Sequence, residues 1–390
     1  MTSELFRFKG LALGVSVATL ALLALVGTCP VQAEEADTEA KYDVYVAESS
    51  EDIIGDPEAW AEEYPNEYNS YIESSTLPYG LGYGTMDKTG KATSWVDVQG
   101  TDGAIEGICL HCHTTEFSYL YADLGGAVVE QDYSDARETI DRSITCYTCH
   151  ANDPSSVTLV MDWIVEAAEK GNIDTDVRNL VCAQCHSFPN WSNATNPDSS
   201  TWSTLQAGTD AEAVWEYYQA QGVDNPSLPG GEGEFNAFYG SVMERAGAVC
   251  TDCHSLKVTA DDGTTYMYHA FQGAEENPAL FEQCLTCHVD STAEERQAAF
   301  NEVKADYEEA YAEAQAAIDE LTAAIEKATE GGADEQVIAD ATYKLNKATF
   351  YFNYASDPGK GIHSVGGGSG NEGCFDKAVA TAGEGMELLK

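Results

Sequence analysis

Residues 109–113 read CLHCH, and the pattern C-x-x-C-H occurs five times in this chain. The five copies are CLHCH at 109–113, CYTCH at 146–150, CAQCH at 182–186, CTDCH at 250–254 and CLTCH at 284–288. One copy of so short a pattern can arise by accident. Five copies between residues 109 and 288 indicate that all five have the same chemical function.

C-x-x-C-H is the attachment signature of c-type haem. Two thiols add to the two vinyl groups of one haem, and the adjacent histidine then lies beneath the iron as an axial ligand. The sequence therefore predicts five covalently attached haem c groups. The predicted attachment residues are Cys109, Cys112 and His113; Cys146, Cys149 and His150; Cys182, Cys185 and His186; Cys250, Cys253 and His254; and Cys284, Cys287 and His288.

Other chemistry that uses paired cysteines fits this pattern less well. A zinc site takes four ligands from two C-x-x-C knuckles, whereas here every pair carries its own histidine. A thioredoxin-like redox pair needs no such histidine and does not recur five times. Disulfides are usual among exported proteins with twelve cysteines, yet ten of the twelve fall into the repeated pattern.

The first 33 residues read as a signal peptide. Arg7 and Lys9 precede an apolar run at 11–26, and Ala33 ends a small-residue cleavage site. The alternative is an uncleaved anchor, because the uncharged segment 10–33 is long enough to span a bilayer. We therefore expect an exported protein of the periplasm or outer cell surface, tethered to the membrane if the segment stays.

The chain is strongly acidic. Its formal charge is −47, and removal of two basic residues and one acidic residue with the signal makes it −48. Such a charge excludes nucleic acid as a partner, because a nucleic-acid-binding protein must neutralise phosphates. It favours partners with cationic surfaces, or it keeps an exported protein soluble.

Few histidines remain for the second axial position of five irons. Of the eight histidines, five belong to the motifs, which leaves His111, His269 and His363. His111 lies between the cysteines of its own motif, and we expect it to face solvent or a haem propionate, or to bridge to a neighbouring haem. His269 and His363 are expected distal ligands, and methionine, which also ligates haem iron, has to serve elsewhere unless an iron stays open.

The spacing of the motifs resembles that of the pentahaem cytochrome c nitrite reductase family, the ammonia-forming periplasmic enzymes. Successive motifs begin 37, 36, 68 and 34 residues apart. The resemblance includes an aromatic-rich arm with WAEEYPNEYNSY at 60–71 and the segments VCAQCH and AGAVCTDCH. It implies haems packed into a mainly α-helical core, long C-terminal helices and little sheet.

The resemblance also implies distal ligands. It places His269 on the second haem and His363 on the fourth. The family histidine before the fourth motif falls on Met243, which implies ligation of the fifth haem. The third haem takes its ligand from the N-terminal arm in the family, where Met86 in GLGYGTMDKTG is the natural substitute.

The chain departs from the family around the first haem, where the resemblance places catalysis. After the third motif the family has Glu-Tyr for calcium and substrate, and this chain has Ser187 and Phe188. Residues 187–242 contain no lysine, arginine or histidine. Calcium is therefore not expected. Reduction of an anion needs positive charge and proton donors, so no catalytic residue is assigned beyond an open iron at His113 with His111 nearby.

Four segments are expected. They are the signal at 1–33, an N-terminal arm at 34–100, a pentahaem-binding core at 101–290 with a short helix within 157–171, and a C-terminal helical region at 291–390. In the last, Ser291 and Glu294 suggest a capping box, and an apolar stripe predicts one helix of nearly 40 residues that ends at Gly331 and Gly332. A second helix follows, carrying Ile338 to Phe352, and this region either covers the haems or forms a homodimer.

Two functions fit these observations. The first is an electron carrier between a membrane donor, such as a quinol-oxidising cytochrome, and a terminal reductase. The second is a reductase of nitrite, hydroxylamine or another small substrate at the first haem. The missing proton donors and mixed histidine and methionine ligation favour the carrier.

Overall fold

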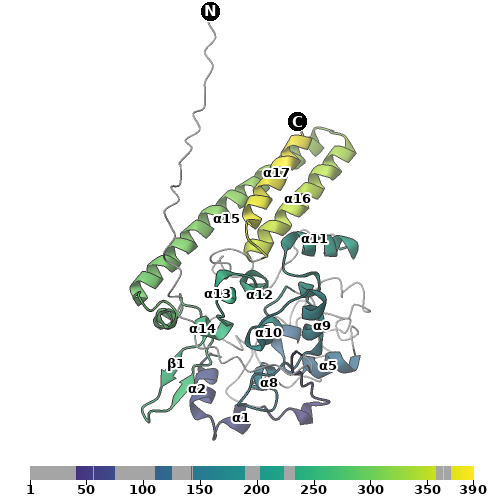
Figure 1. Ribbon diagram of the computed structural model, residues 1–390. Coiled ribbons are helices and arrows are strands. Elements are labelled where there is room, and N and C mark those ends of the chain that lie inside the picture. The colour runs from purple at the N-terminus through teal and green to yellow at the C-terminus, as the bar shows by residue number, and fades with distance from the viewer. Residues whose placement is uncertain are drawn as a thin grey trace, which may run out of the picture. The chain divides into compact units, whose positions relative to one another are not determined.

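The computed structural model describes residues 41–55, 57–74, 110–124, 142, 144–188, 203–223, 233–356, 363 and 370–390. Helices dominate this part of the chain, and its only β-sheet is the antiparallel pair β1 (Lys257–Thr259) and β2 (Thr265–Met267) (Figure 1). The predicted mainly α-helical fold is confirmed. The predicted signal at 1–33 lies outside the described residues.

Short helices form the first half of the described chain. They are η1 (Ser50–Asp52), α1 (Pro57–Trp60), α2 (Pro65–Ser74), α4 (Leu110–His113), α5 (Phe117–Leu124), α8 (Tyr147–His150), α9 (Asp162–Lys170), α10 (Val177–Ala183), η4 (Thr204–Ala207) and α11 (Ala211–Ala220). The helix predicted within 157–171 is α9. The residues before it are extended, and Leu159 bridges Val44 in parallel.

The fourth and fifth motifs lie in a second group of short elements. These are α12 (Glu234–Phe238), α13 (Val242–Arg245), α14 (Cys250–His254) and η5 (Pro278–Thr286). Helix α10 packs on α12 and α14, and η5 packs on α14 and on the first C-terminal helix. One buried core surrounds α9 and the second and third motifs, and it includes Tyr147, Leu159, Ile164 and Leu180.

Three long helices follow the motifs: α15 (Ala293–Glu330), α16 (Glu335–Ser356) and α17 (Cys374–Leu388). They pack side by side (Figure 1) and form a second core with α11. The predicted helix of nearly 40 residues is confirmed as α15, which has 38 residues, but its N-cap is Thr292 rather than Ser291. Thr292 Oγ1 accepts from Glu295 N at 3.2 Å, and Glu295 Oε2 accepts from Thr292 N at 2.9 Å. Helix α17 was not predicted.

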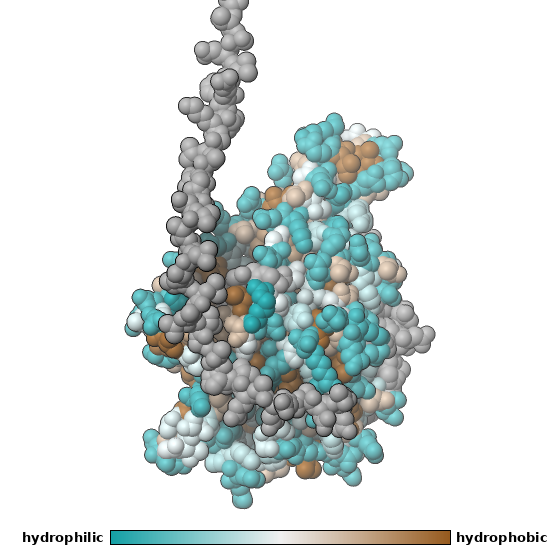
Figure 2. Space-filling model, in the orientation of Figure 1, coloured by the Kyte–Doolittle hydropathy of each residue, from teal (hydrophilic) through white to brown (hydrophobic). Residues whose placement is uncertain are grey.

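The apolar stripe of α15 packs within the chain. Ala314, Ile318 and Leu321 are buried in the second core together with residues of α16 and α17. The molecular face in Figure 2 is largely hydrophilic, with scattered apolar residues, as the strong negative charge leads one to expect. No helix of the described residues is long and apolar enough to cross a membrane.

Candidate haem-attachment sites

Each described C-x-x-C-H motif forms a tight turn. The histidine N–H donates to the carbonyl of the first cysteine in the second motif (2.9 Å), the third (2.8 Å) and the fifth (2.8 Å). The fourth motif is the whole of helix α14. A turn of this kind brings both thiols and the imidazole to one small region of the backbone, as attachment to a single haem requires.

The thiols form no disulfides among the described residues. Ten cysteines are described, and nine of them belong to motifs. Among the described residues, no three His, Cys, Asp or Glu side chains are grouped so that they could hold a metal ion. The described side chains therefore include no four-ligand set of the kind that zinc takes from paired knuckles.

His150 and His269 face each other across a narrow space. Their ring centres lie 6.3 Å apart at an interplanar angle of 39°. His150 belongs to the second motif, and His269 follows β2, more than one hundred residues later in the chain. The family resemblance implied that these two histidines ligate the second haem, and the fold brings their rings close together.

His254 and His363 form a second pair. Their ring centres lie 5.9 Å apart, and the rings are tilted by only 13°. His254 belongs to the fourth motif, and His363 lies beyond α16. This is the pair predicted to ligate the fourth haem.

Both spacings fit an iron between two imidazoles. A metal–imidazole bond is about 2 Å long, so the ring centres of two ligands on opposite sides of one metal lie roughly 6 Å apart. The iron also needs the lone pair of Nε2, which is available when Nδ1 carries the proton. Nδ1 contacts a backbone carbonyl in three of these rings: His150 with Ser156 O (2.7 Å), His269 with Met267 O (2.7 Å) and His254 with Gln272 O (3.2 Å).

The same three imidazoles are kept neutral. Burial lowers the pKa of His150 and His269, and burial together with His363 lowers the pKa of His254 to about 4. A neutral imidazole is the form that ligates a metal. The residues around the second and fourth motifs therefore fit haem as the bound group.

Gln184 joins the first three motifs. Its carbonyl oxygen lies 2.5 Å from Nε2 of His111, in the first motif. Its side-chain Nε2 donates to Thr148 O of the second motif at 3.1 Å, and its Oε1 accepts from Val160 N (2.9 Å) and Met161 N (3.0 Å). Because Gln184 is the third residue of the third motif and is fully buried, it holds the three attachment turns together.

The first and third motifs also touch through their cysteines. Cys112 Sγ lies 3.7 Å from Cys185 O, and Cys185 Sγ lies 3.8 Å from His111 O. The two attachment turns are therefore in direct contact, although 73 residues separate the bonded cysteines along the chain.

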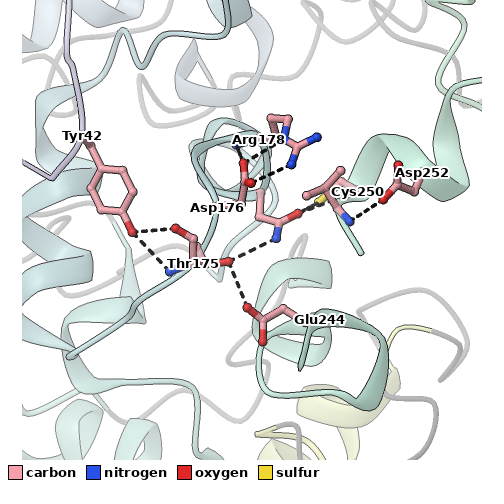
Figure 3. A network of polar contacts seen from close by, with 9 residues as sticks. Tyr42, Thr175, Asp176, Arg178, Glu244, Cys250 and Asp252 are labelled. Carbon is pink, nitrogen blue, oxygen red and sulfur yellow. Dashed lines mark hydrogen bonds and ion pairs between the residues drawn. The ribbon is translucent and has the colours of Figure 1, made fainter. Parts of the chain in front are cut away.

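Asn179 joins the third motif to the fourth. It lies on α10, and its Oδ1 accepts from Cys250 N at 2.9 Å. Its Nδ2 donates to Thr175 Oγ1 at 3.1 Å, and that hydroxyl donates to Glu244 Oε1 at 3.2 Å. Figure 3 shows this network extending from Tyr42, whose hydroxyl donates to Thr175 O at 3.0 Å, to the start of α14.

The thiols at this junction interact directly. The pKa of the Cys182 thiol lies well above its ordinary value, chiefly because of a hydrogen bond with Cys250. Gln283, just before the fifth motif, forms the next junction: its Nε2 donates to Ser255 O at 2.6 Å, and its Oε1 accepts from Lys257 N at 3.3 Å. Successive contacts therefore connect all five motifs, and the third contacts three others.

One of the three expectations for His111 is contradicted, and its contact with a haem propionate or a neighbouring haem stays a prediction. It is only 2 % exposed, so the expectation that it faces solvent is wrong. Its ring packs against Trp163 (centroids 4.9 Å apart) and Phe117 (5.4 Å), and its Nε2 is bonded to the Gln184 carbonyl. Trp163 and Gln184 could not be predicted as partners, because they come from distant parts of the chain.

Phe188 and Ser187, which the resemblance matches to a tyrosine and a glutamate of the family, are both buried. The Phe188 ring packs on Tyr354 with centroids 4.6 Å apart. A Cβ placed at Gly233 would lie 2.2 Å from Phe188 Cζ, so the glycine fits closely against the ring edge. The Ser187 hydroxyl bonds Ala183 O and Ser203 Oγ, each at 2.8 Å.

The structure describes the remaining predicted site residues only in part. Cys109 and Met86 lie outside the described residues, and only the backbone of His113 is described, as the end of α4. Met243 is half-buried on α13, and His288 is exposed after η5, so their joint ligation of the fifth haem stays a prediction. Met161 and Met386 pack in the two cores, as methionines without a ligand role do.

Sequence reasoning missed the residues that join the motifs, namely Gln184, Asn179 and Gln283. Each is an amide inside or beside a motif, and buried amides need several hydrogen-bond partners. The presence of an amide at these positions is visible in the sequence. Their hydrogen-bond partners are not visible in the sequence, because they lie far away along the chain. Ser255 lies 28 residues from Gln283, and His111 lies 73 residues from Gln184.

Comparison with known proteins gives consistent matches. A family model described as Cytochrome c552 matches residues 76–365. Cytochrome c-552 of Maridesulfovibrio salexigens is 25% identical over 246 residues, which cover 57% of this chain and 48% of that protein, so the match spans about half the length of that relative. Cytochrome c-552 of Haemophilus influenzae is 21% identical over 380 residues, covering 79% of this chain and 69% of that protein.

A solved structure has the same fold. It is the cytochrome c nitrite reductase of Desulfovibrio desulfuricans, the catalytic subunit NrfA, described with two calcium sites. It superposes with a TM-score of 0.68 over 88% of this chain and 87% of that chain, at 18% sequence identity.

Proposed function

Because the chain belongs to the cytochrome c552 family, we propose that it is an exported pentahaem cytochrome that carries electrons between a membrane donor and a terminal reductase or other acceptor. Family membership supports covalently attached haem c, which supplies one-electron oxidation and reduction of iron. The number of five haems rests on the five C-x-x-C-H motifs.

The contacts between motifs support a relay. The third motif contacts the first and second through Gln184 and the fourth through Asn179, and Gln283 links the fourth to the fifth. Attachment turns in direct contact keep the bound groups close to one another. The chain's own contribution is to fix these separations with buried hydrogen bonds, which resist rearrangement.

The burial of Phe188 is the observation that favours a carrier over a nitrite-reducing enzyme. A phenylalanine can neither donate a proton nor hydrogen-bond a substrate. This ring also lies within the second core, against Tyr354 and Gly233, rather than facing a pocket. The segment 187–242 has no basic residue to attract an anion, and the acidic chain repels one.

A second candidate function is a reductase that acts at the first haem. The histidine pairs favour it, because His269 lies against His150 and His363 against His254. His111 is bonded to Gln184, which leaves no histidine to cap an iron held by His113. An iron without a sixth ligand can bind a substrate, so this candidate needs an experimental answer.

The family and the charge support a proposal for partners and location. We propose export to the periplasm or outer cell surface, a quinol-oxidising membrane cytochrome as one electron donor, and a homodimer formed through the C-terminal helices. The formal charge of −47 favours cationic docking surfaces on the partners. Calcium is not part of the proposal, because the Ser187 hydroxyl is bonded to Ala183 and Ser203 where calcium would need a carboxylate.

The test is an assay of the purified, haem-loaded protein. Haem is first quantified per chain by its pyridine complex, with five expected. Reduced methyl viologen is then offered with nitrite or hydroxylamine, and ammonia is measured. A carrier is reduced by the dye without forming ammonia. Sustained ammonia production would establish the reductase instead.

A further inference from the structure

His186 of the third motif has a different hydrogen-bond partner from the other haem-region histidines described above. Its Nδ1 lies 3.1 Å from Oε2 of Glu234, a carboxylate. Nδ1 of His150, His254 and His269 instead contacts a neutral backbone carbonyl. The third motif is also the one that contacts three others, so its redox properties affect every route through the chain.

The backbone on both sides of Glu234 is fixed to the third motif. Phe235 N donates to His186 O at 2.9 Å, and Asn236 Oδ1 accepts from Phe188 N at 3.0 Å. Gly233 fits so closely against the Phe188 ring that no side chain can replace its hydrogen there. Glu234 is thus held beside His186 by its neighbours as well as by its own carboxylate.

A carboxylate partner changes what an imidazole does to iron. A carboxylate accepts a stronger hydrogen bond from Nδ1–H than a neutral carbonyl does, and it raises the basicity of the ligating nitrogen. A more basic ligand stabilises ferric iron relative to ferrous iron and lowers the reduction potential. The proton stays on Nδ1, so the reduction remains a one-electron step without proton transfer.

We propose that Glu234 is a positioning residue that lowers the reduction potential of the haem attached at Cys182 and Cys185, through its bond to His186. The inference rests on the proposed haem attachment. It extends that function by giving one site in the relay a potential set by a charged partner. The haems of His150 and His254 lack such a partner among the contacts described for their Nδ1 atoms.

The test is Glu234→Gln in the full-length, haem-loaded protein. The amide keeps the shape of the side chain and offers a neutral oxygen, as the backbone carbonyls do at the other histidines. Because Glu234 also acts on His254 through space, a smaller rise in potential is expected at the haem of His254. Redox titration followed by low-temperature EPR is expected to show the largest rise, about 59 mV, at the haem of His186, which is a tenfold change in a one-electron equilibrium constant. The low-spin signal of that haem changes its g-values as well.

Two further variants separate the hydrogen bond from charge alone. Glu234→Asp keeps the charge but shortens the side chain, and it is expected to raise the same potential. Asp153→Asn removes a carboxylate that acts on His150 through space without bonding its Nδ1, and it is expected to leave the potentials nearly unchanged. If Glu234→Gln fails to load five haems, the aspartate variant decides.

Unchanged potentials and g-values in the Glu234 variants would overturn the proposal. An equal shift in Asp153→Asn would also overturn it, because charge alone would then suffice. Failure of the proposed function is recognised separately, since the wild-type protein would then contain fewer than five haems or would form ammonia.

Discussion

The imidazole rings of His254 and His363 lie nearly parallel, with an interplanar angle of 13° and centres 5.9 Å apart. His254 is the last residue of the fourth motif, and His363 comes from the segment that follows the second long helix. The C-terminal region therefore does more than cover the core: it supplies a side chain to the face of the fourth motif.

Removal of His363 should open the fourth iron. In His363→Ala, the iron loses one of two nitrogen ligands, so a high-spin ferric signal should appear in the EPR spectrum and should be lost on addition of cyanide. Haem content should stay at five per chain, because Cys250 and Cys253 are untouched. Phe271→Leu, which alters a ring packed on His269 without removing a ligand, serves as the control. A wholly low-spin spectrum in His363→Ala would contradict the assignment.

Gln184 should be important for stability. Gln184→Ala leaves Thr148 O, Val160 N and Met161 N without the partners they now have in the protein interior. An unsatisfied buried group costs about 1–3 kcal/mol, so we expect a loss of about 3 kcal/mol or more in the free energy of unfolding by urea. Gln336→Ala removes an exposed amide from α16 and should change it by less than about 0.5 kcal/mol.

Restoring a tyrosine after the third motif should not restore nitrite reduction. In Phe188→Tyr the added hydroxyl on Cζ would press against Gly233, in a position without room for it. We expect no ammonia from nitrite and a destabilisation of about 1–3 kcal/mol. Phe188→Leu controls for the loss of ring contacts with Tyr354. Ammonia formation by the tyrosine variant would show that this position faces a substrate pocket.

Glu212 should make stability depend on pH in the acid range. Burial alone would raise its pKa, but hydrogen bonds from Lys347 and Tyr351 outweigh burial and hold the pKa below its ordinary 4.5. The unfolded chain thus binds a proton at a higher pH than the folded chain does. The stabilisation is complete above pH 4.5 and is lost as the pH falls through the lower folded value.

Thermal unfolding of wild type and Glu212→Gln at several pH values tests this. The variant should be less stable at neutral pH, and the two melting curves should converge as the pH falls below 4.5. A stability difference that stays constant down to pH 3 would show that the carboxylate does not titrate in this way.

Local patterns in the sequence indicated the attachment motifs and the longest helix. The C-x-x-C-H spacing is itself one tight turn, and the α15 stripe repeats over 38 residues, so both are visible without knowledge of the fold. The N-cap of α15 was placed one residue too early, because two adjacent residues bond the Glu295 carboxylate. Ser291 donates its hydroxyl at 3.0 Å, and Thr292 donates its backbone N–H. Helix α17 was missed, since its small residues give no clear stripe and a glycine-rich segment precedes it.

Long-range contacts were harder to predict. The pairing of His150 with His269 was predicted only through the family resemblance, because composition and spacing do not say which histidines meet. The burial of His111 depends on Trp163 and Gln184, which approach from other motifs and helices. Nothing near His186 in the sequence indicates that Glu234, 48 residues later, lies beside it.

The most direct test of the central claim is low-temperature EPR of the fully oxidised protein, recorded alone and with nitrite or cyanide. An electron carrier has five low-spin irons whose signals do not change when either ligand is added. A high-spin ferric signal that nitrite or cyanide converts would show an open iron, assigned to the first motif, and would contradict the carrier in favour of the reductase.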